Sequence, residues 1–176
     1  LIIVALLSCS AMFAQTVAIT ANPGTSGNIV IGQSNYHVSE SIYTDAEIGS
    51  GNFITAGSAI EEVYFFINTL GTGTTINNFR IYMQNVPAGT TTFTSGTYSL
   101  VGYTMVFLGT LTATPVGPVG ITLTTPFVRT AGTNLQVLIL REDNTTHTGY
   151  IFDAAVGNNT NSTELSSRRY NNTTAP

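Results

Sequence analysis

The sequence predicts an all-β protein, consisting of one antiparallel β-sandwich domain of jelly-roll-like type. Short segments alternate apolar and polar residues with a period of two, and no stretch of about 11–18 residues keeps a helical period. Residues that favour turns, mainly Gly, Pro, Asn and Thr, separate these segments at intervals of about 8–12 residues, a spacing typical of sandwiches and barrels. A length of 176 residues fits a single domain with a substantial core.

Several segments are expected to be strands. The alternating apolar residues are Val63, Phe65 and Ile67 in "EEVYFFIN", Phe79, Ile81 and Met83 in "NFRIYMQ", and Val119, Ile121 and Leu123 in "VGITLTT". The run "NLQVLILRE" is almost continuously apolar, which indicates a central strand covered on both faces. The segments "YTMVFLGTLTA", "GYIFDAA" and "SRRYN" bring the expected total to roughly eight to ten strands.

An acidic hexapeptide, "TDAEIG" at residues 44–49, lies between two such runs. The features of a capped helical turn are the capping-box pair Thr44 and Glu47, the staple pair Tyr43 and Ile48, an acid in the first turn at Asp45, and Gly49 as the residue after the turn. The hexapeptide therefore predicts one helical turn joining two strands, in preference to a calcium loop or a catalytic acid site.

The first residues look like the second half of a secretory signal peptide. An apolar run, Leu1 to Leu7, precedes small residues and then Ala14-Gln15. The run is shorter than the roughly 20 residues of a membrane span, and the alternative is a buried first strand. We therefore expect a truncated signal peptide at residues 1–14 and a β-sandwich domain at residues 15–176, which is itself expected to be cut at its C-terminus.

Cys9 is the only cysteine, so cleavage after Ala14 would leave no thiol for a disulfide or a zinc site. The stretch Leu6-Leu7-Ser8-Cys9 also fits the loose pattern of a bacterial lipoprotein cleavage site. We therefore expect a secreted or outer cell-surface location, with lipid anchoring through Cys9 as the alternative.

The composition excludes some partners. Only 8% of the residues are charged, the formal net charge is −4, and the cations are all Arg. Such a chain neutralises few phosphates, so we expect no nucleic-acid partner. No basic amphipathic segment predicts binding to a membrane surface, and no transmembrane span is expected in the domain.

The sequence offers no clear catalytic constellation. His37 and His147 are expected to be ordinary surface or strand residues, because neither lies in a nucleophile motif such as G-x-S-x-G. Glu61 and Glu62 are adjacent, so an extended backbone would point them to opposite faces. Asp153 is a further candidate for a pair of facing carboxylates. We therefore expect no catalytic residue and no cofactor.

Two further candidate sites stay open. Glu142, Asp143 and Asn144 follow an expected strand, where acids commonly form turns and protect sheet edges. Their oxygens also form a weak candidate for calcium, although no metal motif is present. A sugar platform would need exposed aromatic rings, and the tyrosines considered for it are Tyr82, Tyr98, Tyr103 and Tyr150. Cross-strand packing is the other role for such rings.

The segment "SESIYTDAEIGSGNFITAGSAIEEVYFFIN" resembles a β-domain of exported proteins of Bacteroidota-type bacteria, with the pattern Q-x-I-Y-T-x-x-E-I-G followed by G-x-I-x-x-I-x-F. "GITLTTPFVRTAGTNLQVLILREDN" resembles its T-P-F…G-x-x-N-L-x-V run, and "NNFRIYMQNV", "VFLGTLTA" and "SSRRYN" resemble further segments. The resemblance covers about Ile19 to Asn172. It departs at Val119-Gly120, where the family has Trp, and at Arg129, where it has an aromatic residue. The family's final apolar strand is absent.

The resemblance implies a module of a large secreted or surface protein that is exported by type IX secretion. The family pattern has no catalytic residues to carry over. We therefore expect a non-catalytic module with an adhesion, accessory or structural role, an unknown protein or glycan ligand, and other modules of a larger polypeptide as neighbours. The alternative is a carbohydrate-binding module attached to a polysaccharide-degrading enzyme.

Overall fold

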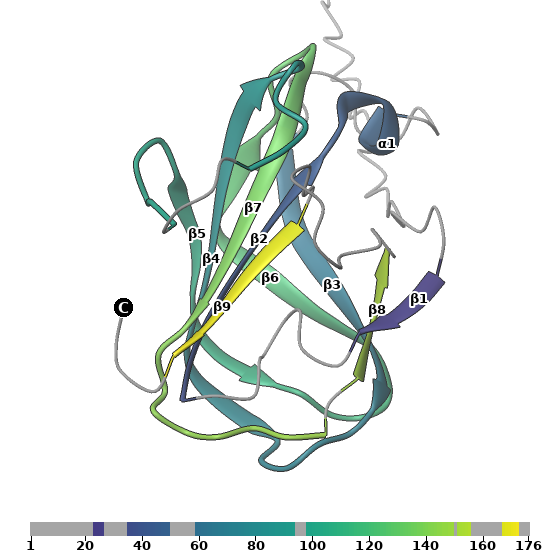
Figure 1. The fold of residues 1–176 in the computed structure, drawn as a ribbon, viewed down its shortest axis with the longest axis vertical. Coiled ribbons are helices and arrows are strands. Elements are labelled where there is room, and N and C mark those ends of the chain that lie inside the picture. Colours follow the sequence, from purple (N-terminus) through teal and green to yellow (C-terminus); the bar gives the residue numbers. More distant parts are fainter. Residues whose placement is uncertain are drawn as a thin grey trace, which may run out of the picture.

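The computed structural model describes residues 23–26, 35–49, 59–93, 98–149, 151–155 and 167–172, and structural statements below concern these residues. They form nine strands and one helical turn (Figure 1). In chain order these are β1 (Pro23–Ser26), β2 (Tyr36–Tyr43), α1 (Asp45–Gly49), β3 (Ala59–Thr69), β4 (Thr75–Pro87), β5 (Thr104–Thr112), β6 (Gly117–Val128), β7 (Thr133–Arg141), β8 (Ile151–Ala155) and β9 (Ser167–Asn172).

The strands form two antiparallel sheets, which confirms the predicted all-β class. Sheet A has the order β1-β8-β3-β6, and sheet B has the order β5-β4-β7-β2-β9. Figure 1 shows the strands of sheet B side by side, with β3 and β6 of sheet A lying across them. One apolar core includes residues of both sheets, among them Ile67, Ile121 and Leu123 from sheet A and Phe79, Ile81 and Ile139 from sheet B. The arrangement is therefore sandwich-like.

The predicted alternation decides which side chains enter this core. Ile67 on β3 and Phe79 on β4 are fully buried, whereas Tyr64 and Phe66 on β3 point to the opposite face and are exposed. The Phe65 and Phe79 rings meet edge to face across the two sheets, with 6.2 Å between their centroids and 83° between their planes. Such a pair adds stability beyond the area that it buries.

β7 is the central strand that its continuous apolar run predicts. It pairs with β4 on one side and with β2 on the other. Leu135 and Ile139 belong to the core between the sheets, and Leu138 and Leu140 pack in a second cluster on the outer face of sheet B. Both faces of β7 are thus covered, as expected for a strand without polar alternation.

The hexapeptide forms one helical turn, α1, as predicted. The Ile48 amide donates to the Thr44 carbonyl at 3.1 Å, and the Ile48 side chain is buried in the core. The Asp45 amide at the start of the turn donates to Oδ1 of Asn134 at 2.9 Å. A distant residue therefore satisfies one of the amides that a helix start leaves without an intrahelical partner. The Glu47 side chain lies outside the described atoms, so the reciprocal capping-box bond stays a prediction.

The side chain of Arg129, which follows β6, is buried against α1. The Arg129 side chain is only 3% exposed and forms an ion pair with Asp45 of α1. A cation at this position fixes the first turn of α1 to the end of β6, in addition to any effect of Asp45 on the helix dipole.

Some predictions lie outside the described residues, namely the signal peptide at residues 1–14 with Cys9, and Tyr150. Of Asp153 only the backbone, within β8, is described. Across the described ranges, no helix combines the length and the apolarity that a membrane crossing requires.

Candidate functional site

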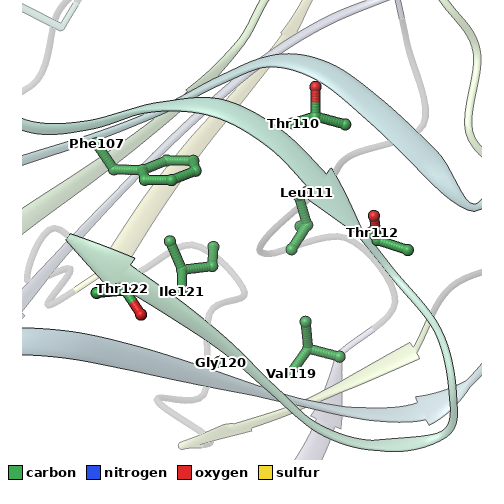
Figure 2. Close-up of a pocket in the computed structure, with 8 residues that line it drawn as sticks. All are labelled: Phe107, Thr110, Leu111, Thr112, Val119, Gly120, Ile121 and Thr122. Atoms are coloured by element: carbon green, nitrogen blue, oxygen red, sulfur yellow. The ribbon is translucent and has the colours of Figure 1, made fainter. Parts of the chain in front are cut away.

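A groove of about 270 Å³ lies between β5 and β6. These strands are edge strands of the two sheets, so the groove follows the seam where the sheets meet. Figure 2 shows side chains from both strands pointing toward one another across this space, namely Phe107, Leu111, Val119 and Ile121. The other lining residues are Thr110, Thr112, Thr122 and Gly120. The β5–β6 groove therefore combines an apolar floor with threonine hydroxyls.

The outer face of sheet A next to this groove carries exposed aromatic rings. We call it the β3–β6 face and define it by the register pairs Glu62 with Thr122, Tyr64 with Gly120, and Phe66 with Pro118. All six residues are exposed, with Tyr64 at 51% and Phe66 at 46%. Gly120 and Thr122 also line the groove, so the two features are continuous.

Tyr64 is held in place on this face. Its hydroxyl donates to Oε2 of Glu62 at 2.7 Å. This hydrogen bond, followed by desolvation and the negative charge of Glu62, raises the pKa of Tyr64 above its ordinary value. A Cβ at Gly120 would lie 2.8 Å from Cε1 of Tyr64 and 2.9 Å from Oε1 of Glu62. Because residue 120 is glycine, the space above its Cα is free for the Tyr64 ring and the Glu62 carboxylate.

A buried charged cluster lies where β7 ends, formed by Arg141, Asp143 and His147, whose side chains are 0%, 3% and 1% exposed. Nη1 of Arg141 contacts Oδ1 of Asp143 and donates to the Thr145 carbonyl at 2.7 Å. Nε2 of His147 lies 2.6 Å from Oδ2 of Asp143. Burial lowers the pKa of the Arg141 guanidinium, and the Asp143 carboxylate opposes that shift.

The cluster resembles part of a catalytic triad in composition but not in geometry. Nδ1 of His147 lies 3.3 Å from the carbonyl oxygens of both Thr72 and Gly73, so this nitrogen is a donor. Both ring nitrogens of His147 therefore face protein acceptors, whereas a general base needs a nitrogen within reach of a substrate proton. The cluster fastens the loop after β7 to the loop between β3 and β4.

The structure corrects two expectations about these residues. His147 is not a surface residue, because Asp143 and two carbonyls supply polar partners that allow its ring to be buried. Glu142 and Asp143 do not protect a sheet edge, because β7 is the central strand of sheet B. The turn-forming role of Asp143 does hold, since its Oδ1 accepts from the Thr145 amide two residues on, at 3.3 Å. His37 is, as expected, a strand residue, and it is fully buried in β2.

The carboxylates considered for calcium have cationic neighbours instead. Glu142 forms an ion pair with Arg80, and the two oxygens of Asp143 contact Arg141 and His147. Among the residues described, no group of three or more His, Cys, Asp or Glu side chains is placed to hold a metal ion. The positive charge that calcium would supply is therefore already provided at this position by protein side chains.

Three of the tyrosines considered for a sugar platform pack together on the outer face of sheet B. Tyr82, Tyr98 and Tyr103 are half-buried against the second apolar cluster. The Tyr103 hydroxyl donates to Oε1 of the buried Glu40 at 3.0 Å. Burial, followed by the negative charge of Glu142, raises the pKa of Tyr98. These rings serve packing, which was the other role considered for them.

The exposed pair Tyr64 and Phe66 was not singled out from the sequence. The signal was present in "EEVYFFIN", because a strand with apolar residues on one face and aromatic residues on the other has two apolar faces. Only one of them can face the core when the strand lies in an outer layer. Glu61 and Glu62 at the start of the same strand are both exposed, and the ladder shifts register between Ile60 and Glu62.

In comparisons with protein-family models, with curated proteins and with solved structures, none matches this chain.

Proposed function

We propose that this chain is a non-catalytic module of a bacterial secreted or cell-surface protein, with an adhesion, accessory or structural role. The observation that carries the proposal is that buried charged side chains of this chain are bonded to other protein groups. Two buried candidates for acid–base chemistry, Asp143 and His147, are bonded to each other and to protein groups. The exposed groups beside the β5–β6 groove are mainly aromatic rings and hydroxyls. This pattern favours binding over bond cleavage.

The proposal includes export by type IX secretion, and the basis for this part is the sequence. The signal-peptide-like residues 1–14 and the resemblance of residues 19–172 to exported Bacteroidota domains support them, with lipid anchoring through Cys9 as the alternative. The ligand is then a protein or glycan at the cell surface, and further modules of a larger polypeptide are its neighbours.

We also propose that the fold is a jelly roll. The strand orders β1-β8-β3-β6 and β5-β4-β7-β2 support this assignment, because two four-stranded antiparallel sheets built from interleaved strands are the pattern of an eight-stranded jelly roll. β9 adds a fifth strand to sheet B beside β2.

Hydrolysis assays test the non-catalytic proposal. The purified protein is incubated with chromogenic glycoside, ester and peptide substrates, alongside the variants Asp143→Asn and Glu62→Gln. We expect no turnover above the buffer rate. Turnover by the wild-type protein that either substitution abolishes, in a variant that remains folded, would refute the proposal. If neither substitution changes the turnover, its source is tested by whether the activity co-elutes with the protein on two orthogonal columns. Co-elution would also count against the proposal.

A second candidate function is carbohydrate binding on behalf of a polysaccharide-degrading enzyme. The specific observation in its favour is the exposed pair Tyr64 and Phe66, since aromatic rings at a surface commonly mark a binding site. Retention of the protein on insoluble polysaccharide, measured by sedimentation of the polymer, tests this function. Recovery of all the protein in the supernatant with every polymer would count against it.

A further inference from the structure

We infer that the β3–β6 face is a binding site for a neutral oligosaccharide, with sugar rings stacked on Tyr64 and Phe66 and a sugar hydroxyl bonded to Glu62. This inference rests on the second candidate function, and it names the site, the residues and the class of sugar.

The β3–β6 face carries two exposed aromatic rings. Tyr64 and Phe66 are the only exposed aromatic side chains in residues 35–48, 59–93 and 98–149, wherever side-chain burial is described. They lie two residues apart in β3, so they share a face and their Cα atoms are separated by roughly 6.7 Å along the strand. Two rings in line on a sheet form an extended apolar strip. The C–H faces of consecutive pyranose rings fit such a strip.

The site is already ordered before a ligand binds. The Tyr64 hydroxyl is fixed by Glu62, and the two side chains lean over the space left by Gly120. Little side-chain freedom at Tyr64 then remains to be lost when a ligand binds. Oε1 of Glu62 points to the same space, where it can accept a hydrogen bond from a hydroxyl group.

The negative charge of the β3–β6 face favours a neutral ligand over an anionic one. The face carries Glu62, with the exposed Glu61 beside it in the sequence. The arginines whose side chains are described form ion pairs elsewhere, with Asp45, Glu142 and Asp143. An anionic polymer would therefore meet like charge at this face, whereas a neutral sugar brings hydroxyl donors. A second copy of the chain, docked with its two-fold axis at Glu62, would bring two Glu62 carboxylates together.

The β5–β6 groove can extend the site. Gly120 and Thr122 belong to both features, and Thr110 and Thr112 of β5 line the far side of the groove. An oligosaccharide long enough to pass the edge of β6 would therefore meet further hydroxyl groups after the two rings.

The test uses NMR titration of the isotope-labelled protein with neutral hexasaccharides, namely cellohexaose, xylohexaose, mannohexaose and maltohexaose. Hexagalacturonate serves as the anionic probe. We expect at least one neutral sugar to cause saturable shifts confined to residues 62–66 and 117–122, and no saturable shift with hexagalacturonate. Saturable shifts that map to another surface would overturn the inference while leaving carbohydrate binding intact. No saturable shift with any of the four neutral sugars would overturn both.

Alanine variants test whether the two aromatic rings, and not exposed apolar side chains in general, bind the sugar. Tyr64→Ala and Phe66→Ala should each weaken binding by about tenfold or more, since a lost ring contact of roughly 1.4 kcal/mol corresponds to that factor. Leu100→Ala and Leu108→Ala are the controls, because these side chains are 40% and 47% exposed and belong to the loop before β5 and to β5 of sheet B. Their affinities should stay within about twofold of wild type.

Two results would contradict the assignment of the rings. One is an affinity of the Tyr64→Ala, Phe66→Ala double variant equal to that of wild type, with the amide spectrum showing that it is folded. The other is concentration-dependent dimerisation in sedimentation experiments that the double variant abolishes, because a second copy would then occupy the face.

Discussion

At the scale of single residues, the Asp143 carboxylate lies between the Arg141 guanidinium and the His147 ring, with almost no exposure. Removing a guanidinium from water costs free energy, and the carboxylate beside it offsets part of that cost. The deletion of one partner from such a group is strongly unfavourable because the remaining charge stays buried. Asp143 is therefore expected to be important for stability although it lies in a loop.

The substitution Asp143→Asn removes the charge and keeps the size of the side chain. We expect the free energy of unfolding to fall by about 3–5 kcal/mol, the usual effect of leaving a buried charge without its partner. Urea denaturation measures this change. Glu61→Gln is the control, because Glu61 is exposed, and it should stay within about 0.5 kcal/mol of wild type. Equal midpoints for the two variants would contradict a stabilising role of the cluster.

Tyr64 provides a spectroscopic check on the β3–β6 face. Its pKa is raised because Glu62 accepts a hydrogen bond from the protonated phenol and its negative charge opposes ionisation. Glu62→Gln removes the charge, so we expect the pKa of Tyr64 to fall toward its ordinary value of 10.0. NMR titration of the Tyr64 ring measures the change. A pKa of Tyr64 that stays the same or rises in this variant would contradict the contact.

At the scale of elements, α1 depends on a residue far away in the sequence. Asn134 at the start of β7 accepts from the Asp45 amide through Oδ1. Its Nδ2 donates to the carbonyls of Ala88 at 3.0 Å and Thr90 at 2.9 Å. One buried amide side chain thus joins α1 to the loop after β4. The local sequence predicted the turn, but its position against the sheets depends on this non-local contact.

Replacing Asn134 by Ala should leave the Asp45 amide and two carbonyls without these partners. We expect a loss of about 1–3 kcal/mol in the free energy of unfolding, the scale for an unsatisfied buried polar group. Thermal and urea denaturation measure it. Asn77→Ala is the matched control, because Asn77 is exposed and its amide oxygen accepts one hydrogen bond, from Thr110. A loss no larger than that of the control would exclude the linking role of Asn134.

Glu47 tests the capping interpretation itself. Glu47→Ala removes the acid that would bond back to the Thr44 amide, and we expect it to lower stability by about 0.5–2 kcal/mol. Sugar binding should remain unchanged, because the hexapeptide is interpreted as a turn and not as a ligand site. Denaturation and the NMR titration measure the two effects. Lost binding at unchanged stability would refute the interpretation.

At the scale of the whole molecule, the sequence predicted the strands better than their arrangement. Alternation and apolar runs identified β3, β4, β6 and β7, because these patterns are local. The pairing of β1 with β8 and of β2 with β9 joins distant segments, and no local pattern determines it. The buried state of His147 has the same cause, since its carbonyl partners come from the loop before β4.

The stability losses caused by substituting two phenylalanines compare the inner and outer faces of the sandwich. Phe79 is fully buried between the sheets, so Phe79→Ala should lower the free energy of unfolding by about 3–5 kcal/mol. Phe66 lies on the outer face of sheet A, and Phe66→Ala should cost less than about 1 kcal/mol. Denaturant midpoints compare the two. A larger loss for Phe66 would reverse the assignment of inner and outer faces on β3.

The order of strands also determines how the domain would respond to a pulling force. β1 and β9, the first and last described strands, lie at the edges of sheets A and B, and each pairs with a single neighbour. Tension applied through the chain on either side of the domain reaches these two strands first. β1 and β9 would then detach and lengthen the tether, while β2 to β7 keep the shared core and the β3–β6 face intact. The ladder between β3 and β6, which carries the proposed ligand face, includes neither β1 nor β9.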